Sequence, residues 1–473
     1  MNKTRSRAVV ALLSICTLLA ACAVGPDYRR PDPITPEQWH EALPHGGDMG
    51  DLAKWWAQFD DPLLAELIDQ AQRDNPGLNQ ALARIAQSRA GVAAARSALF
   101  PSVDANASAQ RGNDNTTAAI QNLGRATLDA GWEIDLFGAR RRGREAAQAR
   151  YEGAQAQWHD ARVSLAAEVA QEYVGLRTCE ALVKNLGEDL ASRMESERLT
   201  HLKVNAGFGA PSDDALATAS SADASTRLNA QQAECDISVK ALVALTGLDE
   251  TDLRQRLTDR HGLLPVPAQF SIRQLPAQTL LQRPDLAASE RELAAASAEI
   301  GVAEAARYPS LTLSGTVGVQ AVRTGGTTFD GNLWSIGPAL NLPIFDAGRR
   351  AADADAAQAR YDEARATYEG KARQAVREVE QALVRLNSAS AREADAKRAA
   401  EGYEKTLAAS NDLWRAGAGS MLDLELSRRI AVSSRIQLLG VQRERVAAWI
   451  SLYRAAGGGW SATDRVAGNV SKD

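Results

Sequence analysis

The 473-residue chain is poor in the residue patterns that mark catalytic and metal sites. Its five histidines lack the HExxH spacing that brings two imidazoles to one metal ion. It contains no GxSxG elbow, P-loop or Rossmann glycine run, so the sequence predicts no enzyme, no cofactor and no metal site. Aromatic residues make up only 5% of the chain, which favours long helices packed through small side chains over one large globular core.

Basic residues do not dominate either. The formal net charge is −5, and residues 1–21 carry basic side chains but no acidic ones. The rest of the chain is therefore more acidic still. A nucleic-acid-binding protein would be expected to present a basic face, so we expect no nucleic-acid partner.

Long apolar runs are missing except at the N-terminus. Residues 1–21 join the basic stretch MNKTRSR to AVVALLSICTLLA, which is too short to span a bilayer comfortably. The pattern predicts a lipoprotein signal peptide whose LAAC ending resembles a bacterial lipobox, with Cys22 as the lipid acceptor. Ala23 stands where such lipoproteins, when retained at the inner membrane, commonly carry Asp, which favours the outer membrane. The alternative is an ordinary secretory signal followed by a stray cysteine.

The chain does contain an internal duplication. The hexapeptide AAQARY occurs at 146–151 and again at 356–361, an offset of 210. Before the hexapeptide, the predicted helix and strand boundaries recur at an offset of 208. The pattern therefore predicts two copies of one structural unit, at 75–247 and 283–457. The period is far longer than that of a solenoid repeat.

Each copy is expected to form a helix, two strands, a very long helix, a turn and a return helix. In the first copy we expect strands at about 102–111 and 126–137, the long helix at 139–205 and the return helix at 213–246. In the second copy we expect strands at about 310–322 and 333–344, the long helix at 347–415 and the return helix at 421–456.

The predicted strands alternate apolar and polar residues, as in VDANASAQ from Val103. A membrane strand needs this alternation, although a soluble hairpin half-buried on a core would show it too. Because no later run could form a membrane helix, a mature chain that crosses a membrane must do so with strands. Four strands cannot close a barrel alone, whereas three chains would supply twelve.

The long helices predict a rod. Roughly 67 residues at 1.5 Å each make about 100 Å, too long for one globular domain. Charged positions such as Arg177 and Glu180 are expected on its solvated face. The glycine-bearing stretches NAGFGAPSD and RAGAGSMLD are expected to turn the chain, with Asp213 and Asp423 capping the return helices.

Two cysteines lie at matching distances from the first turn. Cys179 precedes Phe208 by 29 residues and Cys235 follows it by 27. An antiparallel helix pair would bring both to almost the same height, within disulfide reach. The periplasm is oxidising, and we therefore predict a Cys179–Cys235 disulfide. The alternative is two inert buried thiols.

The layout resembles the TolC-like outer membrane efflux proteins, specifically the NodT-type lipoproteins of RND efflux systems. Six stretches carry the resemblance: CAVGPDYRRP, WWAQFDDPLL with the following NPGL, RPDLAASE, ARYPSL and RAGAGSMLDLE. It implies an α-dominated, internally duplicated chain that closes as a homotrimer with a twelve-stranded barrel and a twelve-helix tunnel. Such ducts sit in the outer membrane of Gram-negative bacteria and dock onto a periplasmic adaptor and an inner-membrane pump, here of RND type. They let drugs, metals or other small solutes out.

The resemblance also assigns the remaining segments. Residues 22–74 become the lipidated N-terminal segment and an equatorial part, 248–282 an equatorial linker, and 458–473 a C-terminal tail. The adaptor-contacting tips are assigned to Gly207, Gly209, Arg415, Gly417 and Gly419. The alternative is that these glycines only turn the chain, and both roles can hold together.

Asp423 falls where the family's tip motif places an acid that lines and gates the periplasmic aperture. A plain helix-capping role is the alternative. The family's second acid, three residues on, is Leu426 here, with Glu425 beside it. Trp132 and Trp334 are expected to anchor the barrel as an aromatic girdle.

Three rival functions remain. A type I secretion duct shares this architecture but exports a polypeptide. A periplasmic adaptor has one helical hairpin between β-rich halves, whereas this chain has two equivalent hairpins. An outer-membrane-anchored enzyme would need a reactive constellation, which the sequence does not show.

Overall fold

The computed structural model describes residues 23–31, 39–40, 52–114, 119–267, 280, 283–458 and 460. Cys22 and most of the 458–473 tail lie outside them. The chain divides into two compact units. Unit 1 comprises Met1–Asp32, Ala83–Ala156 and Ala287–Gly370; unit 2 comprises Pro33–Leu82, Gln157–Leu286 and Lys371–Asp473. Each unit draws on both copies of the repeat, so the two units are not the two copies.

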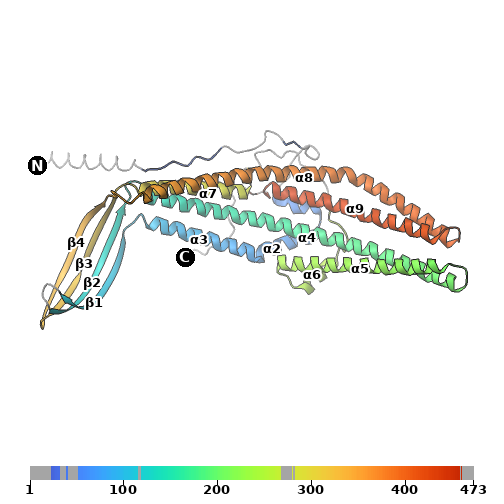
Figure 1. The fold of residues 1–473 in the computed structure, drawn as a ribbon, viewed down its shortest axis with the longest axis horizontal. Helices are drawn as coiled ribbons and strands as arrows, with labels where there is room; N and C mark the ends of the chain where they lie inside the picture. Colours follow the sequence, from blue (N-terminus) through green and yellow to red (C-terminus); the bar gives the residue numbers. More distant parts are fainter. Residues whose placement is uncertain are drawn as a thin grey trace. The chain divides into compact units, whose positions relative to one another are not determined.

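The elements follow the expected order twice (Figure 1). They are η2 (Leu52–Phe59), α2 (Pro62–Asp74), α3 (Pro76–Ser97), β1 (Ser102–Asp114), β2 (Ala119–Ile134), α4 (Ala139–Asn205), α5 (Pro211–Thr246), α6 (Glu250–Leu257), α7 (Pro284–Ala305), β3 (Ser310–Thr324), β4 (Thr327–Asn341), α8 (Arg349–Arg415) and α9 (Met421–Ala455).

The strands form one antiparallel sheet in the order β1-β2-β3-β4. β2 and β4 begin earlier than predicted, at Ala119 and Thr327, and end earlier, at Ile134 and Asn341. For β4 the reason is a two-residue turn. Gly325 and Gly326 have φ of +55° and +85°, the left-handed pair that a tight hairpin needs. Thr324 therefore pairs directly with Thr327, and the strand extends to the turn.

The long helices carry the length of each copy. α4 spans Ala139–Asn205, as predicted, and α8 has the same 67 residues. At 1.5 Å per residue each is about 100 Å long. α8 begins at Arg349 rather than 347, because Ala347 and Gly348 have φ of +55° and +85° and cannot continue a right-handed helix backwards.

The return helices are capped differently from the expectation. α5 begins at Pro211 after an N-cap, Ala210, that forms no side-chain cap bond. In α9 the N-cap is Ser420, whose Oγ accepts the backbone N–H of Asp423 at 3.0 Å. The predicted caps at Asp213 and Asp423 are therefore wrong: both residues lie in the first helical turn. There a carboxylate interacts favourably with the positive end of the helix dipole.

The core of unit 2 contains an aromatic cluster and a buried arginine. Trp55 stacks on Trp449 with ring centroids 4.6 Å apart. Arg177, expected on the solvated face, is fully buried. Its guanidinium donates to Glu180 Oε2 and the carbonyl of Leu257, each at 2.9 Å. Burial of this charge is tolerated because several acceptors replace water.

Candidate functional site

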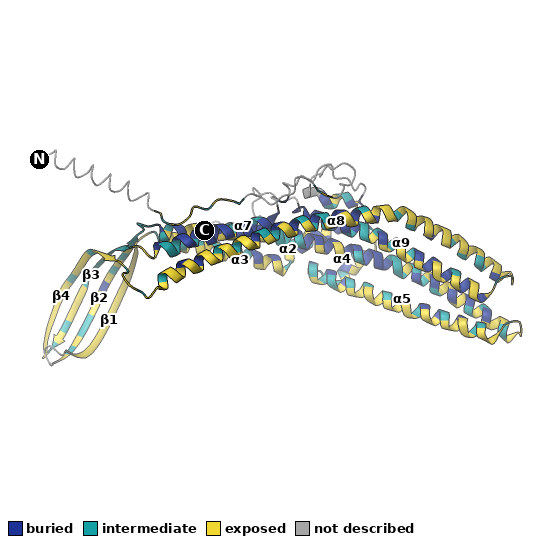
Figure 2. Ribbon diagram, turned by 45° about the horizontal axis from the view of Figure 1, so that its top comes forward, coloured by how far each residue is buried: buried dark blue, intermediate teal, exposed yellow. Residues whose placement is uncertain are grey.

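The sheet has two chemically distinct faces. Cross-strand partners share a face, and the register puts Ala105, Leu128, Val317 and Trp334 in one row. Apolar residues of this face are largely exposed: Val103 66%, Leu128 51%, Val317 57%, Val319 55%, Trp334 77%, Ile336 72% and Leu340 67%. Figure 2 shows the same exposure along the strands. An apolar sheet surface of this kind requires a non-aqueous neighbour.

The opposite face is polar and internally hydrogen-bonded. The Asp129 carboxylate accepts from Asn106 Nδ2 at 2.8 Å, Thr127 Oγ1 at 2.9 Å and Thr316 Oγ1 at 2.7 Å. These donors come from three neighbouring strands. One face therefore suits hydrocarbon and the other suits water, which is the pattern of a barrel wall.

Of the two predicted girdle residues, only one lies near a strand end. Trp132 stands two residues before the end of β2, and its Nε1 donates to the carbonyl of Leu99 at 3.0 Å. Trp334 lies in the middle of β4, opposite Val317. The difference arises because β4 starts at Thr327 rather than 333. Trp334 therefore lies farther from a strand end than predicted, and its place at the membrane interface stays a prediction.

Both hairpin tips have the same construction. Gly207 and Gly417 have φ of +79° and +75° and are open to solvent. Gly209 and Gly419 allow a close approach instead, since an added Cβ would lie 2.8 Å from Val204 Cγ2 and 3.2 Å from Trp414 N, respectively. Both tips are exposed, including Phe208 at 87% and Arg415 at the end of α8. The geometry fits both the turning role and a docking role.

A buried ionic cluster lies behind these tips and joins α4, α5 and α9. Arg193 Nε donates to Asp189 Oδ2 at 2.9 Å, and its Nη1 donates to Glu425 Oε2 at 2.5 Å and to Ser220. Arg428 Nη1 donates to Glu425 Oε1 at 2.5 Å. These four charged side chains are at most 7% exposed. Burial, opposed by the attraction of Glu425, holds the pKa of the Arg428 guanidinium below its ordinary value.

This cluster also settles where the acids after the second tip point. Glu425 is buried against the two arginines, and Leu426 is 46% exposed. Asp423 is exposed and accepts the hydroxyl hydrogen of Ser420 at 2.6 Å. Asp423 is thus the accessible acid of the second tip motif, and Glu425 is occupied by an ionic contact that the sequence analysis missed.

Cys179 and Cys235 are joined by a disulfide between α4 and α5, with an S–S distance of 2.04 Å and a Cα–Cα distance of 5.6 Å. The matching heights follow from the antiparallel pairing of the two helices around the first tip. The bridge closes a segment of 56 residues.

In unit 1, residues 23–31 form an extended strap over α4 and α7. The Val24 N–H donates to the carbonyl of Phe137 at 3.1 Å. Gly25, with φ of +90°, lies so close to α7 that an added Cβ would be 2.4 Å from Gly301 Cα. Tyr28 donates its hydroxyl hydrogen to Glu290. The CAVGPDYRRP signature is therefore also a packing motif.

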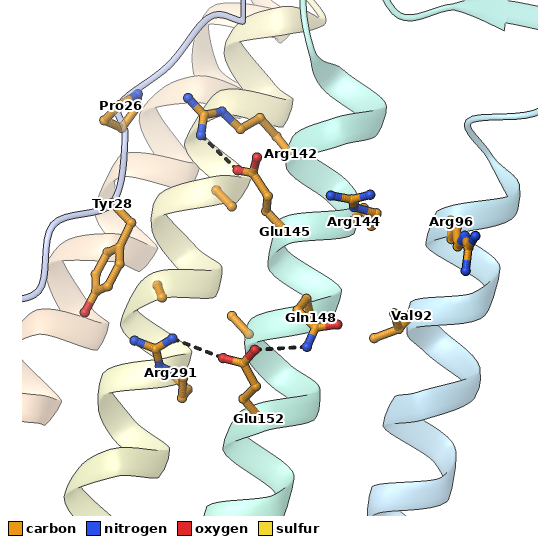
Figure 3. A pocket seen from close by; sticks show the side chains of 13 residues that line it. Pro26, Tyr28, Val92, Arg96, Arg142, Arg144, Glu145, Gln148, Glu152 and Arg291 are labelled. Carbon is orange, nitrogen blue, oxygen red and sulfur yellow. Dashed lines mark hydrogen bonds and ion pairs between the residues drawn. The ribbon is translucent and has the colours of Figure 1, made fainter. Parts of the chain in front are cut away.

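A cleft of about 600 Å³ opens between the strap, α3, α4 and α7 (Figure 3). It is lined by Pro26, Tyr28, Val92, Arg96, Arg142, Arg144, Glu145, Gln148, Ala149, Glu152, Arg291, Ala294 and Ala298. Two of its arginines are paired with acids on its wall: Arg142 with Glu145 at 2.9 Å, and Arg291 with Glu152 at 3.1 Å.

Among the described residues, no helix is long and apolar enough for a bilayer. No group of three or more histidine, cysteine or acidic side chains in that same part of the chain could hold a metal ion. The elements and the sheet define a class: within the described residues, a duplicated helical-hairpin protein whose four-stranded sheet has one apolar face.

Comparison with known proteins agrees. Nodulation protein T of Rhizobium leguminosarum bv. viciae is 30% identical over 448 residues, covering 94% of this chain and 92% of that protein. Outer membrane protein OprJ of Pseudomonas aeruginosa is 31% identical over 465 residues, covering 95% and 96%. The solved structure of the outer-membrane channel OprN matches with a TM-score of 0.84 and 32% identity, covering 93% and 100%.

The profile of the outer membrane efflux protein family matches residues 67–248 and 275–458. The chain belongs to this family. Its fold is that of the TolC-like outer membrane channels, as the resemblance implied.

Proposed function

We propose that this chain is the outer-membrane exit duct of a tripartite efflux system. It conducts small solutes from the periplasm to the exterior and catalyses no reaction. The observation that carries the proposal is the two-faced sheet. Its apolar surface is exposed, and within the described residues the outer edges of β1 and β4 have no partner strand. Open edges are not tolerated in lipid, so copies of the same chain must complete the wall.

Three chains complete it. Twelve strands would form the barrel, and the helices of three chains would continue it as a twelve-helix tunnel. The relatives OprJ, an outer membrane protein, and OprN, an outer-membrane channel, support a membrane-spanning wall built from this fold. The polar sheet face around Asp129 would line the water-filled interior.

The two exposed tips of unit 2 would meet a periplasmic adaptor, which in turn engages an RND-type inner-membrane pump. We assign contact to Gly207, Gly209, Arg415, Gly417 and Gly419. Asp423, repeated three times near the axis, would line the aperture, where a constriction amplifies the field of a charge.

Cys22 would carry the lipid anchor. The strap supports this role because Val24, two residues after Cys22, donates its N–H to the carbonyl of Phe137 in the connection between β2 and α4. An acyl chain on Cys22 would therefore be held beside the sheet-to-helix junction of unit 1.

The particle extracted from outer membranes tests the proposal. We expect a mass of three chains and loss of a fluorescent dye from cells that carry the duct with its own pump and adaptor genes. Deleting the duct gene alone should raise dye accumulation. A monomer in the membrane fraction, or unchanged accumulation after deletion, would contradict the proposed function.

A further inference from the structure

The arginines beside the strap are not equally neutralised. The run ARRRGRE at the start of α4 contains four of them. Arg140 pairs with Glu133 at 2.6 Å, Arg141 with Asp135 at 3.3 Å, and Arg142 with Asp27 at 2.7 Å. Within the described residues, the fourth guanidinium, that of Arg144, forms no ion pair or hydrogen bond, and neither does that of Arg96 on α3.

These two cations face the same cleft. Arg144 and Arg96 lie on either side of the space between α4 and α3 (Figure 3). The acids on the cleft wall, Glu145 and Glu152, are already held by the guanidiniums of Arg142 and Arg291. Arg142 and Arg291 each contact a second acid as well, Asp27 and Glu290, respectively. The cleft of about 600 Å³ thus presents two guanidiniums, those of Arg96 and Arg144, that have no direct partner among the described residues.

The position of Arg96 and Arg144 relative to the strand ends of unit 1 indicates which anion they bind. Arg96 is the next-to-last residue of α3, just before β1, and Arg144 lies in the second turn of α4, just after β2. Both are within about 10 Å of the strand ends along their helices. If the sheet spans the hydrocarbon, this is the depth of the polar headgroups on the periplasmic side.

The second copy provides an internal comparison. At the 208-residue offset Arg96 corresponds to Glu304, which pairs with Arg307 at 3.1 Å. Arg144 corresponds to an alanine at either offset, 352 or 354. The cationic pair therefore belongs to the first copy alone, the copy whose junction also carries the strap.

We propose that the cleft between the strap, α3 and α4 binds the phosphodiester headgroup of an anionic phospholipid, with Arg96 and Arg144 as its ligands. This rests on the proposed membrane position of the sheet. Guanidinium groups suit phosphate oxygens because they donate two parallel hydrogen bonds. One lipid per chain would be bound beside the acylated N-terminus, three per trimer.

The experiment measures phosphatidylglycerol bound to the trimer by native mass spectrometry after mild detergent extraction. Each basic residue near an anionic surface strengthens binding about fivefold, so Arg96→Gln/Arg144→Gln should weaken it by about 25-fold. The matched control, Arg307→Gln/Arg349→Gln, removes the same charge from the junction of the second copy and should retain lipid like the wild type.

Three results would overturn the inference: equal losses in both double variants, no loss in either, or displacement of the lipid by millimolar glycerol 1-phosphate, which would assign the cleft to a soluble phosphate. The same spectra report the number of chains. A trimer without bound phosphatidylglycerol refutes only this site, whereas a monomer refutes the proposed function.

Discussion

Two glycines determine how the N-terminal strap lies on its unit. At Gly301 an added Cβ would be 2.9 Å from Arg142 Cγ and 3.0 Å from the carbonyl oxygen of Val24. The second contact is with backbone and cannot be relieved by a rotamer change. The strap can approach α7 this closely only because neither Gly25 nor Gly301 has a side chain.

We therefore expect Gly301→Ala to displace the strap and cost about 1–3 kcal/mol, as overpacking does. Gly91→Ala is the control, since the added Cβ would meet nothing within 4 Å and helix propensity favours alanine by about 0.5–1 kcal/mol. Limited proteolysis near residues 23–31 and thermal unfolding measure both. Equal protection in the two variants would show that the close approach does not hold the strap.

The four cysteines of the chain make a second residue-scale prediction simple to read. In the proposed mature protein Cys16 would be removed with the signal peptide and Cys22 would be acylated, so the bridged Cys179 and Cys235 would leave no free thiol. Denaturation without reductant, followed by thiol labelling, should modify no cysteine. Two labelled cysteines would mean that the bridge does not form in the cell.

Removing that bridge should also be measurable. Cross-links that close a segment of this length contribute about 2–4 kcal/mol, chiefly by restricting the unfolded chain. Cys179→Ser/Cys235→Ser should therefore unfold at lower denaturant than the wild type and should be insensitive to dithiothreitol. The oxidised wild type should fall to the same level when reduced.

At the scale of elements, the buried ionic cluster holds the two hairpins of one chain together. It joins α4 and α5 of the first copy to α9 of the second through Glu425, whose two oxygens accept from different arginines. Glu425→Gln would leave two buried guanidiniums short of a counter-charge. We expect a loss of about 3–5 kcal/mol, the usual effect of breaking a buried pair.

Glu195→Gln is the matched control for this change. Glu195 also pairs with an arginine one turn away, Arg198, at 2.8 Å, but both side chains are exposed. Exposed pairs contribute about 0–1 kcal/mol. The thermal unfolding of both variants distinguishes the cases, and comparable small losses would mean that the cluster contributes little to the stability of the hairpins.

The sheet makes its own prediction through two adjacent residues of β4. Ile336 belongs to the apolar face and Ser335 to the polar one, opposite Thr316 beside Asp129. A lysine on a lipid-facing position costs about 2–4 kcal/mol near mid-depth. Ile336→Lys should therefore reduce the amount of protein in the outer membrane, and Ser335→Lys should leave it near the wild-type amount. The reverse order would exchange the two faces.

The elements also show how far the sequence predicts the structure. The bounds of α4 follow from a proline-free run between glycine-bearing turns, and composition reports both features directly. The early start of β4 depends on a glycine pair that only the hairpin geometry interprets. Arg177 was expected in water because the backbone carbonyl that it reaches in the core, that of Leu257, is distant in sequence. Pairing across 80 residues leaves no local pattern.

In the candidate site, too, features with a local sequence signal could be predicted, and contacts between residues distant in sequence could not. Tip glycines and the cysteine spacing are local signals, and Cys179 and Cys235 meet in the structure where the spacing placed them. The contact of Glu425 with Arg193 spans 232 positions, and the docking of Gly25 on Gly301 spans most of the chain. No sequence periodicity or motif predicts such contacts, although the glycine inside CAVGPDYRRP is compatible with close packing.

At the scale of the whole molecule, closure by three chains can be tested through the outer edges of the sheet. A cysteine at Ser108 on β1, combined in turn with cysteines along β4, should form cross-links only between chains. We expect one of these cysteine pairs, the one in the correct strand register, to give cross-linked bands of two and three chains, and none larger, on a non-reducing gel. A ladder that stops at two or continues beyond three would contradict a closed ring of three.

The disulfide has no counterpart in the second copy. At the 210-residue offset Cys179 and Cys235 correspond to Ala389 and Arg445, and Arg445 instead forms an ion pair with Glu393 at 2.5 Å. In each chain the α4–α5 hairpin is thus cross-linked by a covalent bond along its length. At the corresponding position the α8–α9 hairpin has a non-covalent contact, which can dissociate and reform. In a ring of six hairpins, cross-linked and uncross-linked hairpins would alternate. Any opening motion in which the two helices of a hairpin slide along each other would therefore be confined to the three α8–α9 hairpins.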